Sequence, residues 1–245
     1  MFEHFFSSQL LAPEYLDWIG QGLLITIWIS FCVIVASTLL GFVVVAARDS
    51  HTVFLRWLAI SYISLFRNTP LLIQLFFWYF AAGTILPESV MQWLNTPHQL
   101  AILDIKLAWP SFEFLAGVIG LTLYSTPFIA EELRAGIYGV KQGQKFAALA
   151  LGLSGWQAMR YVVLPQALKI AMPPLLGQYI NIVKNSSLTM AIGVAELSYV
   201  ARQIESQSLQ TFTAFGVVTI LYIAIIALME ALGQWRQQRL LIKGY

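Results

Sequence analysis

The chain has 245 residues, of which 58% are hydrophobic and 11% are charged, and its mean hydropathy is +0.72. Soluble domains usually carry about 25% charged residues, so this composition excludes an ordinary soluble domain and predicts a membrane protein with several spans. The single cysteine, Cys32, excludes an intrachain disulfide and a cysteine-based metal cluster. The histidines (His4, His51 and His98) are scattered and predict no metal site. No basic start precedes the first apolar run, so we expect no cleavable signal peptide.

Five apolar stretches follow one another along the chain. They are Ile19–Ala47, Val53–Leu86 with an interruption at Arg67-Asn68-Thr69-Pro70, Phe114–Ala130, Gln166–Val183 with Pro173 and Pro174 inside it, and Phe212–Leu232. About 20 apolar residues cross a bilayer as a helix, and only helices or closed barrels satisfy the backbone in lipid. The alternation typical of barrel strands is absent. The sequence therefore predicts an all-α, polytopic membrane bundle of five transmembrane helices in one domain, residues 1–245, with Asn185–Ala195 dipping back into the bilayer.

The charges in the loops predict the orientation, because cytoplasmic loops are enriched in Lys and Arg. One side holds the basic residues Arg48, Arg56, Lys141, Lys145, Arg160, Arg236, Arg239 and Lys243. The other side is mainly acidic and holds Glu3, Glu14, Asp17, Glu88, Asp104 and Glu113, together with Lys106. We therefore expect the N-terminus outside and the C-terminus in the cytoplasm.

The loop Glu88–Glu113 is then external. It contains Trp93, Trp109 and Pro110. Two interpretations stay open for its aromatic residues: they anchor the loop at the membrane interface, or they form a docking surface for an external partner.

The cytoplasmic stretch GQKFAALALGLSGWQAMRYVVLP (Gly143–Pro165) is unusually polar for its surroundings. Gln144–Leu151 is rich in helix formers, and Gly152 offers a C-terminal stop. A second short piece, Gly155–Val163, leads to a helix that we expect to start at Leu164-Pro165, since proline suits a first helical turn. The stretch is either an amphipathic helix lying on lipid or a docking helix for another protein.

The spacing within this stretch resembles the EAA loop of inner-membrane permease subunits of ABC importers. That pattern reads Glu-Ala-Ala, three residues, Gly, nine residues, then Ile-x-Leu-Pro. This chain has Phe146-Ala147-Ala148, three residues, Gly152, nine residues, then Val162-Val163-Leu164-Pro165. Other segments are similar to the polar amino acid branch of that family, over about residues 16–232 in all: LFRNTPLLIQLFFWYF (Leu65–Phe80), YSTPFIAEELRAGI (Tyr124–Ile137) and VKNSSLTMAIGVAEL (Val183–Leu197).

This resemblance implies the type I ABC importer permease fold, with the loop at about residues 139–165 forming a coupling helix in a groove of an ATPase. The residues that it implies for ATPase coupling are Gln144, Phe146, Ala147, Ala148, Gly152, Leu164 and Pro165. The implied partners are two copies of the ATPase subunit, a second permease (a sister chain or a second copy), a periplasmic or surface amino acid-binding protein, and lipid of the bacterial inner membrane. Phe146 replaces the glutamate of the family and exchanges a charged contact for an apolar one.

Polar residues inside the apolar stretches are candidates for the substrate path, because they are costly in lipid. The candidates are Arg67, Asn68, Gln74, Tyr124, Thr126, Glu131, Lys184, Asn185, Ser186 and Ser187. Arg67 either lines a gate or snorkels to headgroups. Glu131 and Arg134 are three residues apart and are expected to form an ion pair that closes the inner end of the bundle. Lys184 either meets a substrate carboxylate or pairs with Glu196 or with an acid on a partner.

The chain lacks the Gly-x-x-x-x-Gly-Lys-Ser/Thr loop that holds phosphates, so ATP and magnesium are expected on the partner ATPase and no cofactor on this chain. No nucleophile–base pair, metal spacing or nucleic-acid motif is present in the sequence. We predict a non-catalytic permease that imports polar amino acids by alternating access, with glutamate or aspartate as the best candidates. The alternatives are a stand-alone secondary transporter acting as a homodimer, which its lack of internal repeats disfavours, and a membrane-embedded enzyme or scaffold.

Overall fold

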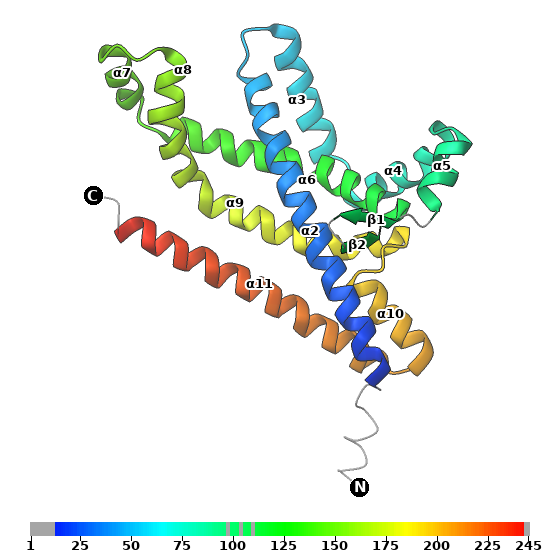
Figure 1. Cartoon of the computed structure of the whole chain (residues 1–245). Coiled ribbons are helices and arrows are strands. Elements are labelled where there is room, and N and C mark those ends of the chain that lie inside the picture. Colours follow the sequence, from blue (N-terminus) through cyan, green and yellow to red (C-terminus); the bar gives the residue numbers. More distant parts are fainter. Residues whose placement is uncertain (1–12, 97–98, 103–104, 109–110, 243–245) are drawn as a thin grey trace. The chain divides into compact units, whose positions relative to one another are not determined.

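The structure is a computed structural model that describes residues 13–96, 99–102, 105–108 and 111–242, with side chains for 13–81, 84–96 and 111–237. His4, His98 and Trp109 lie outside the described residues. Figure 1 shows the elements in chain order: α2 (Pro13–Arg48), α3 (Val53–Arg67), α4 (Leu71–Ile85), α5 (Glu88–Asn95), β1 (Gln99–Ile102), β2 (Ile105–Ala108), α6 (Phe112–Gly139), α7 (Gln142–Ala150), α8 (Gly155–Ala158), η1 (Met159–Val163), α9 (Leu164–Ser186), η2 (Ser187–Ile192), α10 (Leu197–Ser208) and α11 (Thr211–Ile242).

Three of these helices are long and apolar enough to cross a membrane: α2, α6 and the Thr211–Gln237 part of α11. The second apolar stretch forms two helices of 15 residues each, α3 and α4, separated at Asn68-Thr69-Pro70. Pro70 causes this break, because it has no N–H to continue the helical ladder and its ring disfavours a helical conformation at the residue before it. The predicted interruption is confirmed, and the structure supports at least three membrane-crossing helices.

One short β-hairpin lies between α5 and α6, and the predicted all-α class is otherwise confirmed. β1 pairs with β2 in antiparallel register, with Gln99 opposite Ala108 and Ile102 opposite Ile105. Each strand has four residues, which is too short an alternation to stand out in the sequence beside long helical stretches. The apolar stretches themselves are all helical, as predicted.

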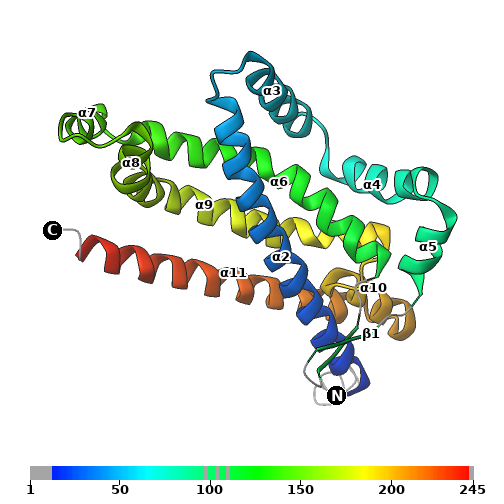
Figure 2. The same ribbon diagram turned by 45° about the horizontal axis from the view of Figure 1, so that its top comes forward.

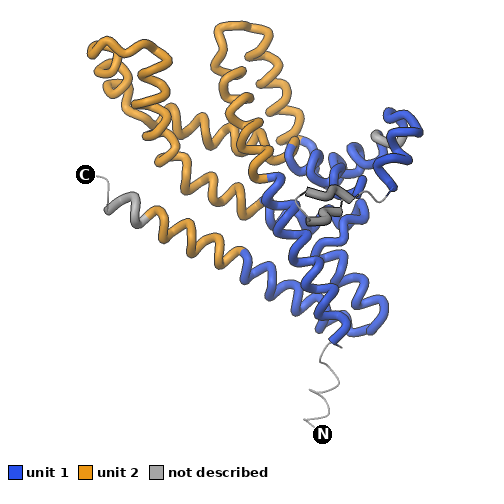
Figure 3. The backbone as a smooth tube through the Cα atoms, in the orientation of Figure 1, with its two compact units in different colours: residues 1–33, 69–122, 182–225 blue, residues 34–68, 123–181, 226–245 orange. Residues whose placement is uncertain are grey.

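Backbone contacts divide the chain into two compact units, which Figure 3 draws in different colours. Unit 1 comprises residues 1–33, 69–122 and 182–225, and unit 2 comprises residues 34–68, 123–181 and 226–245. Each unit therefore gathers three segments that are distant in sequence.

The core of unit 1 lies where α10 packs against α2 and α11. Its buried members are Ile19, Leu197, Val200, Ala201, Ile204, Ala214 and Val218. Gly22 allows the close approach, since a Cβ at this position would lie 2.9 Å from Cγ2 of Val200. Thr26 adds a polar link: its Oγ1 accepts a hydrogen bond from the N–H of Leu197 (3.1 Å) and donates one to the carbonyl of Gly22 (2.9 Å). The start of α10 is thus fixed on α2.

In unit 2, α6 and α9 lie side by side (Figures 1 and 2). Their closest approach is at Gly136, where a Cβ would lie 2.6 Å from the carbonyl oxygen of Ala167 and 2.7 Å from Cβ of Ala171. Val140 and Val163 are buried beside Ala167. Small residues commonly allow such contacts between membrane helices. This contact holds both ends of the segment that joins α6 to α9.

Gly136→Ala is expected to lower the free energy of unfolding by about 1–3 kcal/mol, because a carbonyl oxygen and a methyl group on α9 leave no room for the added carbon. Gly177→Ala is the matched control, since no atom lies within 4 Å of its Cβ position; alanine should leave stability unchanged or raise it. Thermal unfolding of both variants in one detergent is the measurement. Equal melting temperatures would contradict the proposed close packing.

Candidate functional site

The segment that joins α6 to α9, residues 141–163 (the α7–α8 segment), begins with a short helix that has a defined end. After α7, Gly152 adopts φ = +85°. Its N–H donates to the carbonyl of Leu149 (3.0 Å), and the N–H of Leu153 donates to the carbonyl of Ala148 (3.2 Å). These two bonds form a Schellman end, which favours glycine at the left-handed position. The predicted glycine stop is confirmed.

The helix that follows also has a defined start. Oγ of Ser154 accepts a hydrogen bond from the N–H of Gln157 (3.3 Å), and the N–H of Ser154 donates to Oε1 of Gln157 (2.8 Å). This reciprocal arrangement is a capping box. With a fixed end to α7 and a fixed start to α8, the turn between the two helices has little conformational freedom.

The return to the membrane begins where the sequence predicts, because α9 starts at Leu164. The prediction did not include the π-helical turn η1, through which α8 runs into α9. In this turn the N–H of Leu164 donates to the carbonyl of Met159, which is one residue wider than the α-helical bond. Pro165 has no N–H to make an α-helical bond and its ring needs space, so a wider turn just before it is favourable.

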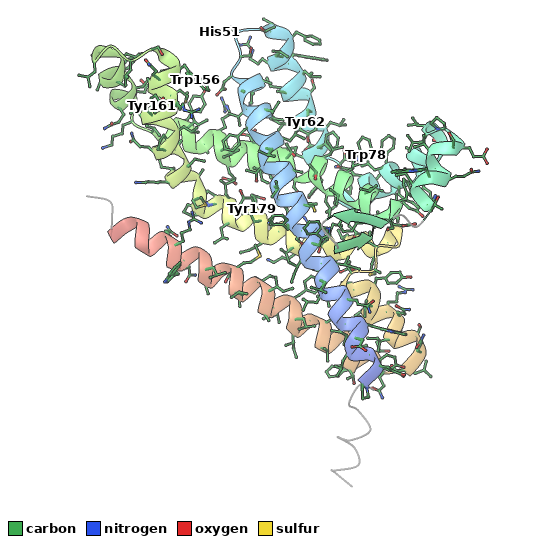
Figure 4. All side chains as sticks on the ribbon, viewed as in Figure 1. His51, Tyr62, Trp78, Trp156, Tyr161 and Tyr179 are labelled. Atoms are coloured by element: carbon green, nitrogen blue, oxygen red, sulfur yellow. The ribbon has the colours of Figure 1, made fainter. Side chains whose placement is uncertain are left out.

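Large apolar side chains are exposed along the α7–α8 segment. The exposed fractions are 62% for Phe146, 84% for Leu151 and 70% for Trp156, and Figure 4 shows Trp156 and Tyr161 on the α8–η1 part. Ala147 is exposed as well, whereas Ala148 is buried. Exposed apolar groups gathered on a fixed turn are typical of an interaction surface.

A cavity of about 500 Å³ lies between α7, the end of α6 and the connection after α2. The residues that line it are Asp49, His51, Ile137, Tyr138, Val140, Lys141, Gln142, Lys145, Phe146, Met159 and Val163. Phe146 is therefore both an exposed side chain and a wall of this cavity. Phe146, which stands where the EAA pattern has glutamate, therefore borders a cavity that both polar and apolar residues line.

A charged cluster lies in unit 2 where α2 and α3 meet α6. The carboxylate of Glu131 pairs with the guanidinium of Arg48 and lies 4.0 Å from that of Arg67. The guanidinium of Arg67 lies 5.4 Å from the centroid of the Phe128 ring, and the ring of Tyr124 packs against the same ring at 5.3 Å. Two predicted path residues, Arg67 and Tyr124, thus contact the ring of Phe128, and a third, Glu131, lies beside Arg67. Phe128 itself was not among the predicted residues.

The prediction of an ion pair between Glu131 and Arg134 is wrong, because each residue pairs with a residue at the end of α2. Nε of Arg134 donates instead to Oδ1 of Asp49 (3.2 Å), and the hydroxyl of Tyr138 donates to the same oxygen (3.3 Å). A pair within one helix contributes only about 0.2–0.5 kcal/mol. Arg48 and Asp49 are adjacent at the end of α2 and carry opposite charges. Glu131 pairs with Arg48 and Arg134 pairs with Asp49, so each ion pair also joins α2 to α6.

Two further predicted residues cap the broken helix around Pro70. Nδ2 of Asn68 donates to the carbonyl of Ser64 (2.7 Å), and Nε2 of Gln74 donates to the carbonyl of Thr69 (3.0 Å). The Ser64 carbonyl also accepts a hydrogen bond from the N–H of Asn68 (3.3 Å), so the two side chains add donors to main-chain carbonyls on either side of the break. Thr126 is fully buried in α6.

The polar turn at the end of α9 is also satisfied within its own backbone. Oγ of Ser186 donates to the carbonyl of Val183 (2.8 Å), and Oγ of Ser187 donates to the carbonyl of Lys184 (2.7 Å). Asn185 is half-buried, and the side chain of Lys184 is exposed. The serines therefore shape the change from α-helix to the 3₁₀ turn η2.

Glu196, in the connection between α9 and α11, does not pair with Lys184. Its fully buried carboxylate accepts hydrogen bonds from the N–H groups of Ser198 and Tyr199 (2.9 Å each) and from the hydroxyl of Tyr222 (2.5 Å). Burial raises the pKa of Glu196 to about 7, whereas a lysine partner would lower it. Glu196 is the N-cap of α10 and links that helix to α11.

The predicted path residues divide between the units. Unit 2 holds Arg67, Asn68, Tyr124, Thr126 and Glu131, and unit 1 holds Gln74, Lys184, Asn185, Ser186 and Ser187. Of these, the structure brings Arg67 and Tyr124 to the ring of Phe128 and places Glu131 beside Arg67. The sequence analysis named Arg48 only as a loop residue and did not name Asp49; the adjacency of these two opposite charges at the end of a span was the available signal.

Glu131→Gln is expected to lower the free energy of unfolding by about 1–2 kcal/mol, because it removes the carboxylate from two neighbouring guanidinium groups. Glu230→Gln is the matched control: Glu230 is exposed, and the described part of the chain offers it no ion-pair partner within 4 Å. A double-mutant cycle with Arg48→Met isolates the pair. Zero coupling between Arg48 and Glu131 would contradict the cluster.

The family model that matches this chain is described as "Binding-protein-dependent transport system inner membrane component", and it covers residues 37–242. That range contains both the charged cluster and the α7–α8 segment. The chain therefore belongs to this family, and the resemblance found in its sequence is confirmed.

Individual relatives and solved structures show which transporters this chain resembles. The glutamate/aspartate import permease protein GltJ of Escherichia coli (strain K12) is 35% identical over 213 residues, covering 87% of this chain and 83% of that protein. The probable glutamine ABC transporter permease protein GlnM of Bacillus subtilis (strain 168) is 34% identical over 225 residues, covering 92% and 94%. A crystal structure of an amino acid ABC transporter with histidines matches with a TM-score of 0.75 at 30% identity, covering 92% and 95%. The inward-facing MetNI methionine ABC transporter, at 18% identity and a TM-score of 0.71 over 94% of this chain and 99% of that one, shares the fold.

Proposed function

We propose that this chain is the permease subunit of an ATP-binding-cassette importer for polar amino acids, and that it does not hydrolyse ATP itself. The names of the relatives support amino acids as cargo, since they include a glutamate/aspartate permease and a glutamine permease. The sequence has no phosphate-binding loop, so the energy must come from a partner ATPase. Glutamate and aspartate are the cargo that we favour, and glutamine is the second candidate.

The coupling role rests on the α7–α8 segment. Its turn is fixed by a Schellman end and a capping box, and its base is held by the contact at Gly136. Phe146, Leu151 and Trp156 are exposed on it. A fixed apolar projection can transmit the movement of a partner to α6 and α9, whereas a helix that merely lies on lipid needs no fixed turn. The residues proposed for the coupling role are Gln144, Phe146, Ala147, Ala148, Gly152, Leu164 and Pro165. Ala148 is buried, so it would serve this role by packing α7 and not by touching the partner.

Ala147→Glu is expected to reduce the amount of ATPase that co-purifies with the chain at least about tenfold. Ala147 is exposed and small, so it permits close approach, and a carboxylate desolvated in that contact costs several kcal/mol. The measurement is the ATPase-to-permease ratio after purification from the native membrane in a mild detergent, with ATP-driven uptake measured in parallel.

Gln234→Glu introduces the same charge at an exposed position of α11, outside the α7–α8 segment. This control should retain its ATPase. If Ala147→Glu and Gln234→Glu retained equal amounts of ATPase while both were well expressed, the coupling assignment would be wrong.

We also propose five spans, with α3 and α4 together forming the second and α9 the fourth, and with the N-terminus outside. The exposed basic residues Lys141, Lys145 and Arg160 of the α7–α8 segment support this orientation. In the assembled importer, two ATPase copies would bind on the cytoplasmic side. A second permease, either a sister chain or a second copy, would complete the path, and an external binding protein would deliver the amino acid.

Cysteine labelling tests this orientation, because only Cys32 must first be replaced. In a Cys32→Ser background, Gly143→Cys should react with a membrane-impermeant maleimide from the cytoplasmic side, and Gln92→Cys should react from the outer side. Both positions are exposed, and a Cβ at Gly143 meets nothing within 4 Å. The reverse labelling pattern would overturn the proposed topology.

Within the permease, we propose that the cluster around Phe128 closes the inner end of the path. Glu131 is already paired with Arg48 and approached by Arg67, so its charge is compensated before any cargo arrives. Opening the inner end would then require these ion pairs to separate. A movement of the α7–α8 segment would separate them by displacing α6, which carries Glu131. Lys184, with its exposed ammonium group, is the better candidate for meeting a carboxylate of the cargo.

A further inference from the structure

A cavity of about 370 Å³ lies in unit 2 between α9 and the last part of α11, and no residue of the charged cluster or of the α7–α8 segment lines it. The residues that line it are Lys169, Met172, Pro173, Leu176, Tyr179, Met229, Leu232, Gly233, Arg236 and Gln237. Most of these are apolar, two are basic, and none is acidic. Figure 4 shows Tyr179 on α9.

The two ends of this cavity differ in chemistry. α9 and α11 run in opposite directions (Figures 1 and 2). They touch at Leu176 and Gly233, where a Cβ on Gly233 would overlap Cδ2 of Leu176. Since a helix rises 1.5 Å per residue, Lys169 lies about 10 Å to one side of this contact and Arg236 lies about 5 Å to the same side. Tyr179 and Met229 lie on the other side, so one end is cationic and the other is apolar.

The cationic end has no internal partner in the described structure. Among the described residues, neither Lys169 nor Arg236 has a carboxylate within 4 Å. Glu230 is the one acidic residue of α11, and it does not line the cavity. The charged residues that line the cavity are therefore all basic, and they lie beside apolar walls from α9 and α11.

We propose that this cavity binds an anionic phospholipid, with the phosphate headgroup at Lys169 and Arg236 and the upper part of an acyl chain against Met172, Leu176 and Met229. Basic pockets between membrane helices on the cytoplasmic side suit such headgroups, and the side chains of Lys and Arg keep their apolar stems along the walls while the charges reach the interface. A free amino acid would fit poorly, because the apolar end offers no partner for an ammonium group other than the hydroxyl of Tyr179. That hydroxyl is already hydrogen-bonded to Oγ1 of Thr38 (3.1 Å).

The test is native mass spectrometry of the complex purified from its own membrane, delipidated and titrated with dioleoylphosphatidylglycerol or dioleoylphosphatidylcholine. These lipids share their chains and phosphate and differ in net charge. Wild type should bind phosphatidylglycerol in preference. Lys169→Gln combined with Arg236→Gln should weaken that binding about 25-fold, since each cation near an anionic surface contributes a factor of about five. Arg56→Gln combined with Arg202→Gln changes the net charge equally, at exposed residues that do not line the cavity, and should leave binding unchanged.

Met229→Trp separates a pocket from general charge attraction, because it fills the apolar end and keeps both cations. It should weaken phosphatidylglycerol binding at least about fivefold; unchanged binding would overturn the proposal. Equal binding of the two lipids by wild type would also overturn it. If the Lys169/Arg236 double variant kept phosphatidylglycerol but lost a bound amino acid, the cavity would belong to the substrate path and the lipid proposal would be wrong.

Discussion

The close contact of α6 with α9 at Gly136 is the constraint on which the rest of unit 2 depends. A side chain of one carbon at this position would overlap a carbonyl oxygen and a methyl group of α9. The two helices are therefore held together just where the chain leaves α6 and re-enters α9. The α7–α8 segment spans these two ends, so any force on it reaches both helices. Without this contact, the turn between α7 and α8 would keep its own conformation but would not be held in a fixed position relative to α6 and α9.

Charge compensation is the second constraint. Ionisable groups near lipid are costly unless they are paired, and the structure pairs Arg48 with Glu131 and Asp49 with Arg134. Uncharged polar groups follow the same rule more locally, since the hydroxyls of Ser186 and Ser187 bond to carbonyls of their own helix. Lys169 and Arg236 stand apart from this pattern at the edge of an apolar cavity, which is why a charged lipid is the partner that we infer for them.

Local signals in the sequence predicted local structure well. Gly152 ends α7 because a left-handed residue is needed there, and Pro70 breaks the second apolar stretch because it lacks a donor. Contacts between distant segments could not be predicted in the same way. Nothing local distinguishes Arg48 from Arg134 as the partner of Glu131, since the choice depends on how α2 meets α6. The π turn before Pro165 was missed because a proline in a first turn is equally consistent with a new helix.

The most direct test of the proposed function is uptake into proteoliposomes that contain this chain, the proposed second permease and the binding protein, with and without the ATPase. We predict that glutamate or another polar amino acid accumulates only when the ATPase is present and ATP is supplied on its side, with no effect of a sodium or proton gradient. Gradient-driven accumulation in the absence of the ATPase would contradict it and would favour the stand-alone secondary transporter.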